Sequence, residues 1–585
     1  MNDSPAPRPA PAELRSDELW LFRNLPLRLV IPVGLLAVAA SLVAVAFHAP
    51  WWATLIAAAV PVLIGLFPVR GTPFGLRFGS WAAFKWRQAR RREMTESRLF
   101  DVPLPEGGSY GLRWDGTLLT TMLRIDPPPD TLTLLKRGSL STDQVLPLTE
   151  IASCLRQYDL ELDSADVIST GTRTASAEAV LSGYAASIAP LGHLYDEILG
   201  PLPAIAHRTV WLVLRLNPLN NSKAVDNRGG GPEGALRSAI IATRRVANRL
   251  AARGITASVL TSAEMTSAVR ELSRGIPVGQ FVEHPKSLEH NGIHLNTFQI
   301  DPDAFTADGL AAIWTVRSLA TTVTVRLRPI AKSSTRGEPS ADTIEVDARV
   351  RYDATEELDT PPLPGLRELN GLQLWALADT LSFGAQETRS SGYRGPLEAL
   401  SDIAVPTAGC GQLIGADATG RGIAVPLVGD GSRRIDVVSG LPLAQQVILR
   451  AIALGAGAVV HTNRPGAWQS MINNVGSTHA LSLASSVTQS SRQNIMNPRA
   501  PHPAATIIVF DGVPASAPPG SATVLSVYDR LPDDYQPDDA DVTILQHPND
   551  PHMVTVHTPA ARTVAQLVTT PTEQRFIGLA PARAI

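Results

Sequence analysis

The stretch from residue 29 to residue 69 reads LVIPVGLLAVAASLVAVAFHAPWWATLIAAAVPVLIGLFPV and contains no charged residue. It divides into two apolar runs, Leu29–Phe47 and Trp51–Val69, which the residues HAP at 48–50 separate. Each run has about 19 residues, which at about 1.5 Å per residue gives roughly 28 Å, enough to cross the hydrocarbon core of a bilayer. The sequence therefore predicts two transmembrane helices joined as a tight hairpin.

The charges around this stretch predict its orientation. Arg23 and Arg28 precede the first run, a cluster of arginines follows the second, and the tip between them is uncharged. Basic residues favour the cytoplasmic side of a membrane. A cleaved signal peptide would be shorter, would start closer to the N-terminus and would not be followed at once by a second span. We expect a two-span protein of the bacterial inner (plasma) membrane, with both termini and the soluble domain in the cytoplasm.

Tryptophan and basic residues at the ends of the hairpin form the candidate membrane-interface site, because indole rings and cationic side chains favour the headgroup region. These residues are Trp51, Trp52, Arg70, Arg77, Trp81, Lys85, Trp86, Arg87, Arg90, Arg91 and Arg92. Aromatic and basic residues interleaved in this way suit an amphipathic helix on lipid, a docking segment for a partner at the membrane surface, or a nucleic-acid contact. The adjacent span favours the membrane surface, and we predict membrane lipids and no nucleic acid as partners.

Composition limits the remaining possibilities. The 585 residues suggest about three to five structural units, and the formal net charge of −3 gives no sign of a nucleic-acid-binding protein. The two cysteines, Cys154 and Cys410, match no metal or redox spacing and are expected to be buried thiols.

The soluble part alternates strand and helix patterns. Residues 111–125 (GLRWDGTLLTTMLRI) predict a hairpin that turns at Asp115-Gly116. The range 235–253 has apolar residues three and four apart and predicts an amphipathic helix, with Gly254 as its C-cap. The predicted fold class is α/β or α+β, with two mixed units after the two-helix N-terminal transmembrane hairpin.

The predicted organisation has six segments. They are a disordered tail (1–20), the transmembrane hairpin (21–70), a basic-aromatic juxtamembrane segment (71–105), a first α/β domain (106–330), a polar linker or long loop (331–364), and a second α/β domain with a partly mobile tail (365–585). Within the first domain, the polar, glycine-rich range 220–234 predicts a mobile loop.

A nucleotide site is the main enzymatic possibility, because strand, glycine-containing turn, helix and strand follow in order over 434–462. The turn SGLPLAQQ at 439–446 has no lysine for the phosphates, no Ser or Thr in the position that binds magnesium, and a proline that removes one backbone amide. GADATGRG at 415–422 has the glycine spacing of a phosphate loop but lies between two strands, which favours a hairpin turn. Neither motif predicts nucleotide binding.

Other catalytic patterns are absent from the sequence. His284, His290 and His294 lie close together around a loop, but a solvated loop explains them better than a zinc site. No nucleophile elbow and no pair of carboxylates on one helix face is evident. We predict a protein that is not an enzyme and has no cofactor and no metal.

The order of several blocks resembles EccE, a membrane component of the mycobacterial-type type VII (ESX) secretion system. After the hairpin and the basic segment come GLRWDGTLLTTMLRI at 111–125, LGPLPAIAHRTVWLVLRLNP at 199–218 and GPEGALRSAIIATRRVANRLAARG at 231–254. RSLATTVTVRLRP at 317–329 follows, and 411–430 and 443–468 are similar to longer members of the family. The likeness covers most of residues 20–470.

The resemblance implies a structural subunit that sits with EccB, the ATPase EccC and EccD in an inner-membrane complex exporting WXG100-type substrates. The mycosin protease is a further candidate partner. It implies no catalytic residue. Two alternatives remain at this point, a membrane-tethered enzyme and a membrane-anchored regulator that binds a small ligand in one of the α/β units.

Overall fold

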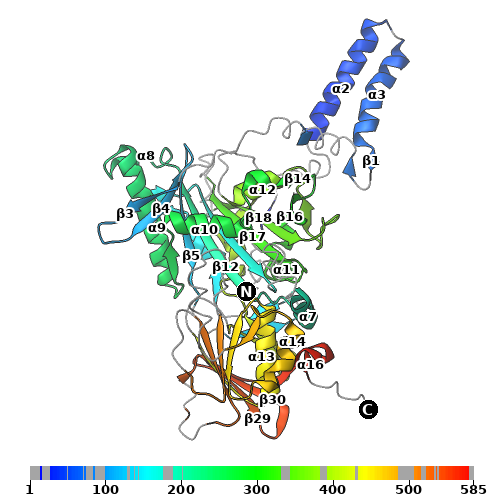
Figure 1. The fold of residues 1–585 in the computed structure, drawn as a ribbon. Coiled ribbons are helices and arrows are strands. Elements are labelled where there is room, and N and C mark those ends of the chain that lie inside the picture. The colour runs from blue at the N-terminus through cyan, green and yellow to red at the C-terminus, as the bar shows by residue number, and fades with distance from the viewer. Residues whose placement is uncertain are drawn as a thin grey trace, which may run out of the picture.

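The computed structural model describes residues 13–15, 27–48, 50–69, 72–73, 84–85, 99–127, 132–136, 139–141, 144–174, 189–200, 202–330, 343–381, 392–427, 433–484, 506–515, 522–531, 535 and 539–578. These residues form a helical hairpin and two large β-sheets with helices packed on them (Figure 1). The predicted mixture of helix and sheet is confirmed.

The hairpin consists of α2 (Leu27–Ala46) and α3 (Trp51–Leu66), which lie side by side at one end of the molecule (Figure 1). The second helix ends at Leu66 rather than at Val69. Phe67 precedes Pro68, and a residue before proline is disfavoured in the helical conformation. Pro68–Val69 instead forms β1, which pairs with β2 (Thr72–Pro73). Within the described part of the chain, none of the helices combines the length and the apolar character that a membrane span requires.

The first sheet is antiparallel throughout. Its order is β14 (Val282–Glu283), β15 (Leu288–His290), β16 (Ile293–Ile300), β18 (Thr343–Ala354), β17 (Ala320–Pro329), β11 (Ser164–Thr172), β12 (His207–Leu216), β5 (Leu119–Ile125), β4 (Ser109–Trp114) and β3 (Leu99–Pro103). Three short strands pair beside this path, β13 (Ala257–Val259) on β5, β19 (Leu366–Glu368) on β16 and β20 (Tyr393–Pro396) on β18.

Helices cover both faces of the first sheet. One face packs its alternate Val, Leu and Ile side chains against α5 (Leu148–Ser153), α9 (Gly231–Ala251) and α11 (Ala307–Ile313). The other face carries α10 (Ser262–Leu272) and α12 (Gln373–Thr380). The short helix α8 (Ser222–Asp226) precedes α9. Because helices cover both faces, the central strands β11, β12, β17 and β18 bury most of their polar residues as well as their apolar ones.

The second sheet has a parallel part and an antiparallel part. The parallel strands run in the order β26 (Leu481–Leu483), β25 (Ala458–Thr462), β27 (Ile507–Asp511), β28 (Thr523–Tyr528), β24 (Arg434–Val438) and β29 (Val542–His547). The antiparallel strands continue with β30 (Asp550–Thr558), β31 (Ala561–Leu567), β22 (Gln412–Ala416), β23 (Gly422–Val425), β6 (Thr133–Lys136) and β7 (Ser139–Ser141). Its helices are α13 (Leu441–Ala453), α14 (Gly466–Val475) and α16 (Pro571–Ile577).

The two sheets are joined by more than one segment. β6 and β7 precede most of the first sheet in the chain, yet they complete the edge of the second sheet, where Leu135 is fully buried. α7 (Ala189–Leu199), which lies between β11 and β12 in the chain, packs against α13 of the second unit. β21 (Ala404–Pro406) follows the whole first sheet in the chain but pairs with β8 (Val145–Pro147) in the core of that sheet. In Figure 1, α7 lies where the green and yellow parts of the chain meet. The two units are therefore connected by strand pairing and helix packing, and not only by a linker.

Three regions differ from the sequence predictions. The range 331–364 contains β18, which has neighbours on both sides within the first sheet. The range 220–234 contains α8 and the start of α9, because the Asn221 side chain ties this segment to the backbone of Glu161 and Asn217. In the predicted N-terminal tail, Arg15 exchanges two backbone hydrogen bonds with Arg394 of β20. A free strand edge offers backbone groups of this kind to a passing segment.

A small two-stranded ladder, β9 (Arg156–Gln157) with β10 (Leu160–Glu161), completes the strands. Short 3-10 turns lie at Val278–Gln280, Pro302–Ala304 and Leu397–Leu400. The predicted hairpin at 111–125 is confirmed as β4 and β5, and Asp115 accepts hydrogen bonds from the backbone amides of Thr117 and Leu118 at its turn.

Candidate functional site

The outward faces of α2 and α3 are apolar and exposed. Trp51 and Trp52, the first two residues of α3, are 75% and 55% exposed. The other large apolar side chains exposed on the hairpin are Val30, Ile31, Leu35, Leu36, Val38, Leu42, Val43, Val45, Phe47, Leu55, Ile56, Val60, Leu63, Ile64 and Phe67. A contiguous apolar surface of this extent marks a lipid or protein contact in a folded protein.

The interior of the hairpin is closely packed and its polar side chains are satisfied locally. A Cβ at Gly65 would come within 2.7 Å of the Val33 side chain, so the glycine allows the two helices to approach. The hydroxyls of Ser41 and Thr54 donate to the backbone carbonyls of Val38 and Trp51 in their own helices. Such internal hydrogen bonds are what an apolar surrounding demands of a helix.

Three of the predicted membrane-interface residues lie in the described part of the chain. Trp51 and Trp52 begin α3, next to the turn of the hairpin. The Lys85 ammonium lies 6.0 Å from the ring centroid of its neighbour Phe84, which is buried. The others lie outside the described residues, and they are Arg70, Arg77, Trp81, Trp86, Arg87, Arg90, Arg91 and Arg92.

The turn between β24 and α13 has the position of a phosphate loop but different contacts. Gly440 is the N-cap of α13 and Pro442 stands in its first turn, without a backbone amide hydrogen. The Gly440 amide donates to Oε1 of Gln546 at 3.1 Å. Residues 415–422 form the predicted hairpin turn between β22 and β23, where Asp417 and Arg421 form an ion pair of 2.8 Å.

The histidine loop does not assemble a metal site. The rings of His284 and His294 lie 6.3 Å apart, and the Nδ1 of His290 lies 3.3 Å from the carbonyl oxygen of Gln280. In the part of the chain that is described, no three metal-ligating side chains converge.

Sequence reasoning missed a row of buried charges on the α12 face of the first sheet. Asp166 of β11 stands opposite Arg326 of β17, which in turn stands opposite Asp347 of β18. Arg326 donates to Asp166 (2.9 Å) and, from Nη1, to Asp379 of α12 (2.8 Å). The sequence signal is the alternation TVTVRLR and VDARVRYD, where a charge at every second position places all of them on one face.

Further arginines complete this network. Arg215 of β12 donates to Asp166 at 2.5 Å, and Arg349 of β18 donates to Asp379 at 2.6 Å. The guanidinium of Arg349 also lies 4.2 Å from the ring centroid of Trp375. Opposite charges directly across a sheet stabilise its register, and like charges there would disrupt it.

The arginines determine the protonation of the buried carboxylates. Burial alone would raise the pKa of Asp166, but Arg215 and Arg326 hold that pKa below its ordinary value. Burial opposes ionisation of Asp379 as well, yet Arg326 and Arg349 hold its pKa well below the usual range. Both carboxylates are therefore charged at neutral pH, which suits a structural network and not an acid–base catalyst.

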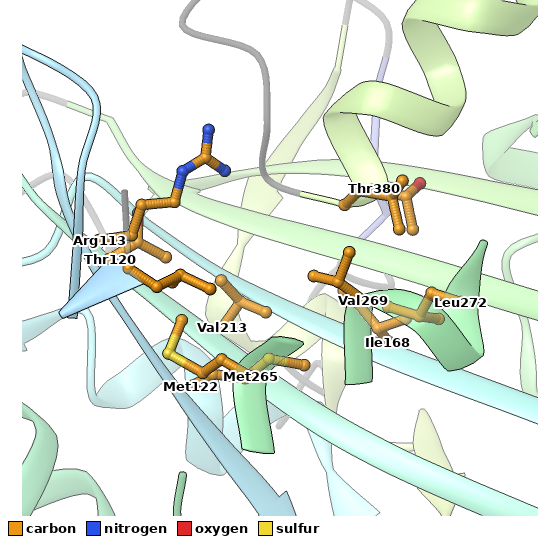
Figure 2. Close-up of a pocket in the computed structure, with 11 residues that line it drawn as sticks. Arg113, Thr120, Met122, Ile168, Val213, Met265, Val269, Leu272 and Thr380 are labelled. Atoms are coloured by element: carbon orange, nitrogen blue, oxygen red, sulfur yellow. The ribbon is translucent and has the colours of Figure 1, made fainter. Parts of the chain in front are cut away.

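A hollow lies beside this network, between α10 and the strands (Figure 2). Its volume is about 20 Å³, which is room for about one water molecule. Figure 2 shows Met122, Val213 and Met265 close to one another, with the Arg113 guanidinium extending away from them. The lining is mainly aliphatic and thioether groups, with the hydroxyls of Thr120 and Thr380, and these groups do not provide a nucleophile with a general base.

Comparisons with known proteins support the resemblance found in the sequence. Residues 204–300 match the family model EccE, whose description refers to the translocon of the type VII ESX secretion system. This range includes β12, α9, α10 and β16, and so covers part of the first sheet and one helix on each of its faces.

Several curated proteins are similar to the chain. The ESX-1 secretion system protein EccE1 of Mycolicibacterium smegmatis is 30% identical over 246 residues, which are 39% of this chain and 50% of that protein. The ESX-2 secretion system protein EccE2 of Mycobacterium tuberculosis is 24% identical over 416 residues, 71% of each chain. The ESX-5 secretion system protein EccE5 of Mycobacterium marinum is 27% identical over 276 residues, 47% of this chain and 64% of that protein. The match spans half the length of the first of these relatives.

The family match on the first sheet and the named relatives from three ESX systems confirm the resemblance to EccE read from the ordered sequence blocks.

Proposed function

We propose that the chain is a non-enzymatic structural subunit of a type VII (ESX) protein secretion complex in the inner membrane, and that it supports the export of WXG100-type substrates. The observation that carries this proposal is the similarity to proteins named as components of ESX secretion systems, which in one case extends over 71% of this chain. The contacts in the candidate sites support a structural role, because the charged side chains of the network around Asp166 and Asp379 are paired with one another.

The proposal includes burial of the α2–α3 hairpin in the membrane. The two helices have 20 and 16 residues, or about 30 and 24 Å at about 1.5 Å per residue. The hydrocarbon core is about 30 Å thick, and a shorter helix is accommodated by local thinning of the bilayer. The exposed apolar surface supports this placement, because each Å² of apolar surface removed from water is stabilised by about 25 cal/mol. Both termini and the two sheets then lie in the cytoplasm.

Partners are proposed on the same basis. The other ESX core components EccB, EccC and EccD, with the mycosin protease as a further candidate, would contact the hairpin or the soluble units. Trp51, Trp52 and the basic residues from Arg70 to Arg92 would contact headgroups. An ATPase partner would supply the energy, because a phosphate loop needs backbone amides that are free to bind phosphate. In the β24–α13 turn Pro442 has no amide hydrogen, and the Gly440 amide already donates to Gln546.

Native electrophoresis tests this assignment. A tagged copy is expressed in its own host, the membranes are extracted in mild detergent, and the tagged band is identified by mass spectrometry. We expect a very large complex that contains an ATPase of the FtsK/SpoIIIE type and a many-span subunit. An unrelated two-span protein with the same tag is the control for adventitious association. Migration of the chain alone or as a small homo-oligomer, with those partners present elsewhere on the gel, would contradict the proposal.

A further inference from the structure

The parallel part of the second sheet has a specific strand order. Along the chain its strands follow as β24, β25, β26, β27, β28 and β29, but in space the order is β29-β24-β28-β27-β25-β26. After β24 the chain forms α13 and then crosses over the positions of β28 and β27 before it adds β25. Sequential strands are neighbours in most sheets, so this long crossover is a distinctive feature.

P-loop NTPases of the RecA type have this arrangement. Their phosphate loop follows a central strand and opens a helix, and the strand that ends in the metal-binding aspartate lies two places away, with one later strand inserted between them. Here β24 and α13 stand in the first position and β28 is the inserted strand. β27, with the sequence IIVFD, ends at Asp511. All these strands are parallel, so their carboxyl ends meet at one edge, where ligands of open α/β sheets bind.

A guanidinium occupies the position of the metal at this edge. Arg464 follows β25 and donates to Asp511 from Nη2 at 2.5 Å and from Nε at 3.0 Å. Asp511 is completely buried, and its Oδ2 also accepts from Trp468 Nε1 and Thr462 Oγ1, both at 2.8 Å. Arg464 reaches as well to Asp529, just beyond the end of β28, at 3.2 Å. It therefore bridges the ends of β27 and β28.

A side chain also occupies the position of the phosphate. Gln546, near the end of β29, accepts the hydrogen bond of the Gly440 amide through Oε1. Its own amide group donates to the carbonyl oxygen of Pro551 at 2.8 Å, which holds the side chain in this orientation. An amide oxygen thus takes the hydrogen bond that a phosphate oxygen takes in an active phosphate loop.

We propose that the second sheet is a P-loop NTPase fold that has replaced its ligand with its own side chains, with the Arg464 guanidinium in place of the magnesium ion and the Gln546 amide in place of a phosphate oxygen. The unit consequently binds neither nucleotide nor magnesium and holds one conformation without them. This inference is independent of the secretion assignment, because it uses only the topology and contacts of the second unit.

The buried negative charge of Asp511 explains why a cationic side chain must take the place of the metal ion. An isolated carboxylate in the protein interior is unstable by several kcal/mol unless a cation or hydrogen-bond donors compensate it. Burial alone would raise the pKa of Asp511, but the bonds from Arg464, Trp468 and Thr462 hold it below its ordinary value. Asp511 therefore stays ionised without a metal.

Thermal unfolding of the full chain in detergent micelles tests the proposal. Three variants are compared with the wild type: R464A, the double variant R464A/D511N, and R421A, which removes another arginine–aspartate pair of the same unit that lies at an exposed turn. We expect R464A to lower the melting temperature by several degrees and R421A to leave it nearly unchanged. The double variant should be more stable than R464A, because asparagine no longer needs a cation. An equal or lower stability of the double variant would overturn the proposal.

Nucleotide is tested on the same wild-type protein. Titration with Mg-ATP and Mg-GTP should leave the melting temperature unchanged, and a saturable increase would overturn the proposal. If R464A does not accumulate as folded protein, R464K replaces it. Lysine keeps the charge but loses the two-pronged geometry, so R464K should melt below the wild type, and R464K/D511N should recover part of the loss.

Discussion

Arg450 of α13 and Glu573 of α16 form a buried two-pronged ion pair. Nε of Arg450 lies 2.7 Å from Oε1 of Glu573, and Nη2 lies 3.1 Å from Oε2. The two side chains are 3% and 1% exposed. Arg450 also donates to the backbone carbonyls of Leu413 and Val568, so a single guanidinium joins α13, α16, the strand β22 and the segment after β31.

Replacing Arg450 with methionine should destabilise the second unit strongly. The substitution leaves the Glu573 carboxylate buried without its cation, and breaking a buried pair in this way costs about 3–5 kcal/mol. The measurement is the free energy of unfolding in urea. Replacing Arg237, whose pair with Glu233 is exposed on α9, should change that free energy by less than about 1 kcal/mol. Equal effects of the two substitutions would show that the Arg450 pair does not determine the stability of the unit.

Two glycines with similar backbone angles provide a test of the close packing beside the β22–β23 pair. Gly411 has φ +70° and its amide donates to the carbonyl oxygen of Ala206, whereas Gly420 has φ +78° in an exposed turn. A Cβ at Gly411 would lie 2.3 Å from the carbonyl oxygen of Val425, while nothing lies within 4 Å of one at Gly420.

Alanine at Gly420 should therefore cost only the backbone strain, about 1–2 kcal/mol. Alanine at Gly411 should cost at least about 2 kcal/mol more, because the backbone must also move away from the new methyl group. Thermal melting of the two variants measures the difference. Similar melting temperatures would mean that the packing of Gly411 against the end of β23 adjusts without strain.

The buried charge network should make stability depend on acid pH. The pKa values of Asp166 and Asp379 are lowered in the folded protein, so their contribution is fully present above the ordinary aspartate pKa of about 4 and is lost as the pH falls below it. The variant D379N lacks part of this contribution at every pH. We expect it to be less stable than the wild type at pH 7 by about 3 kcal/mol, and the difference to shrink in acid.

Urea unfolding at several pH values checks this expectation. Glu233→Gln on the exposed face of α9 is the matched control, and its unfolding curve should follow the wild type throughout. A difference between D379N and the wild type that stays constant from neutral to acid pH would contradict an ionised Asp379.

Cysteine labelling should locate the hairpin relative to the membrane. Both native cysteines, Cys154 and Cys410, are buried, so the wild type should react little with a membrane-impermeant maleimide. His48→Cys places a thiol at the tip of the hairpin, and Leu219→Cys places one on the soluble part, where Leu219 is 81% exposed. We expect the first variant to be labelled in intact cells and the second only after permeabilisation.

Labelling of both variants only after permeabilisation would contradict a hairpin that crosses the membrane. Labelling of Leu219→Cys alone in intact cells would reverse the proposed orientation. Either result leaves the resemblance to EccE unchanged, because that resemblance depends on the sequence matches and not on the topology.

Local patterns predicted many elements correctly because their determinants lie within one segment. The helix α9 has its apolar side chains at helical spacing, and the hairpin of β22 and β23 has a turn that Asp417 stabilises through bonds within the turn itself. The strand β18 was not predictable in this way. Its Asp347, Arg349 and neighbouring charges read as a polar linker, since the groups that neutralise them come from distant elements such as α12.

The sequence by itself determined the apolar hairpin, the resemblance to EccE, and the absence, in the turn at the start of α13, of a lysine and of a Ser or Thr in the position that binds magnesium. Each of these depends on the order of residue types along the chain. Only the tertiary structure decided that β6 and β7 complete the second sheet, that Arg326 joins Asp166 to Asp379, and that Arg464 neutralises Asp511. These relationships join residues far apart in sequence, and burial makes each charge depend on a partner that only the fold brings within hydrogen-bonding distance.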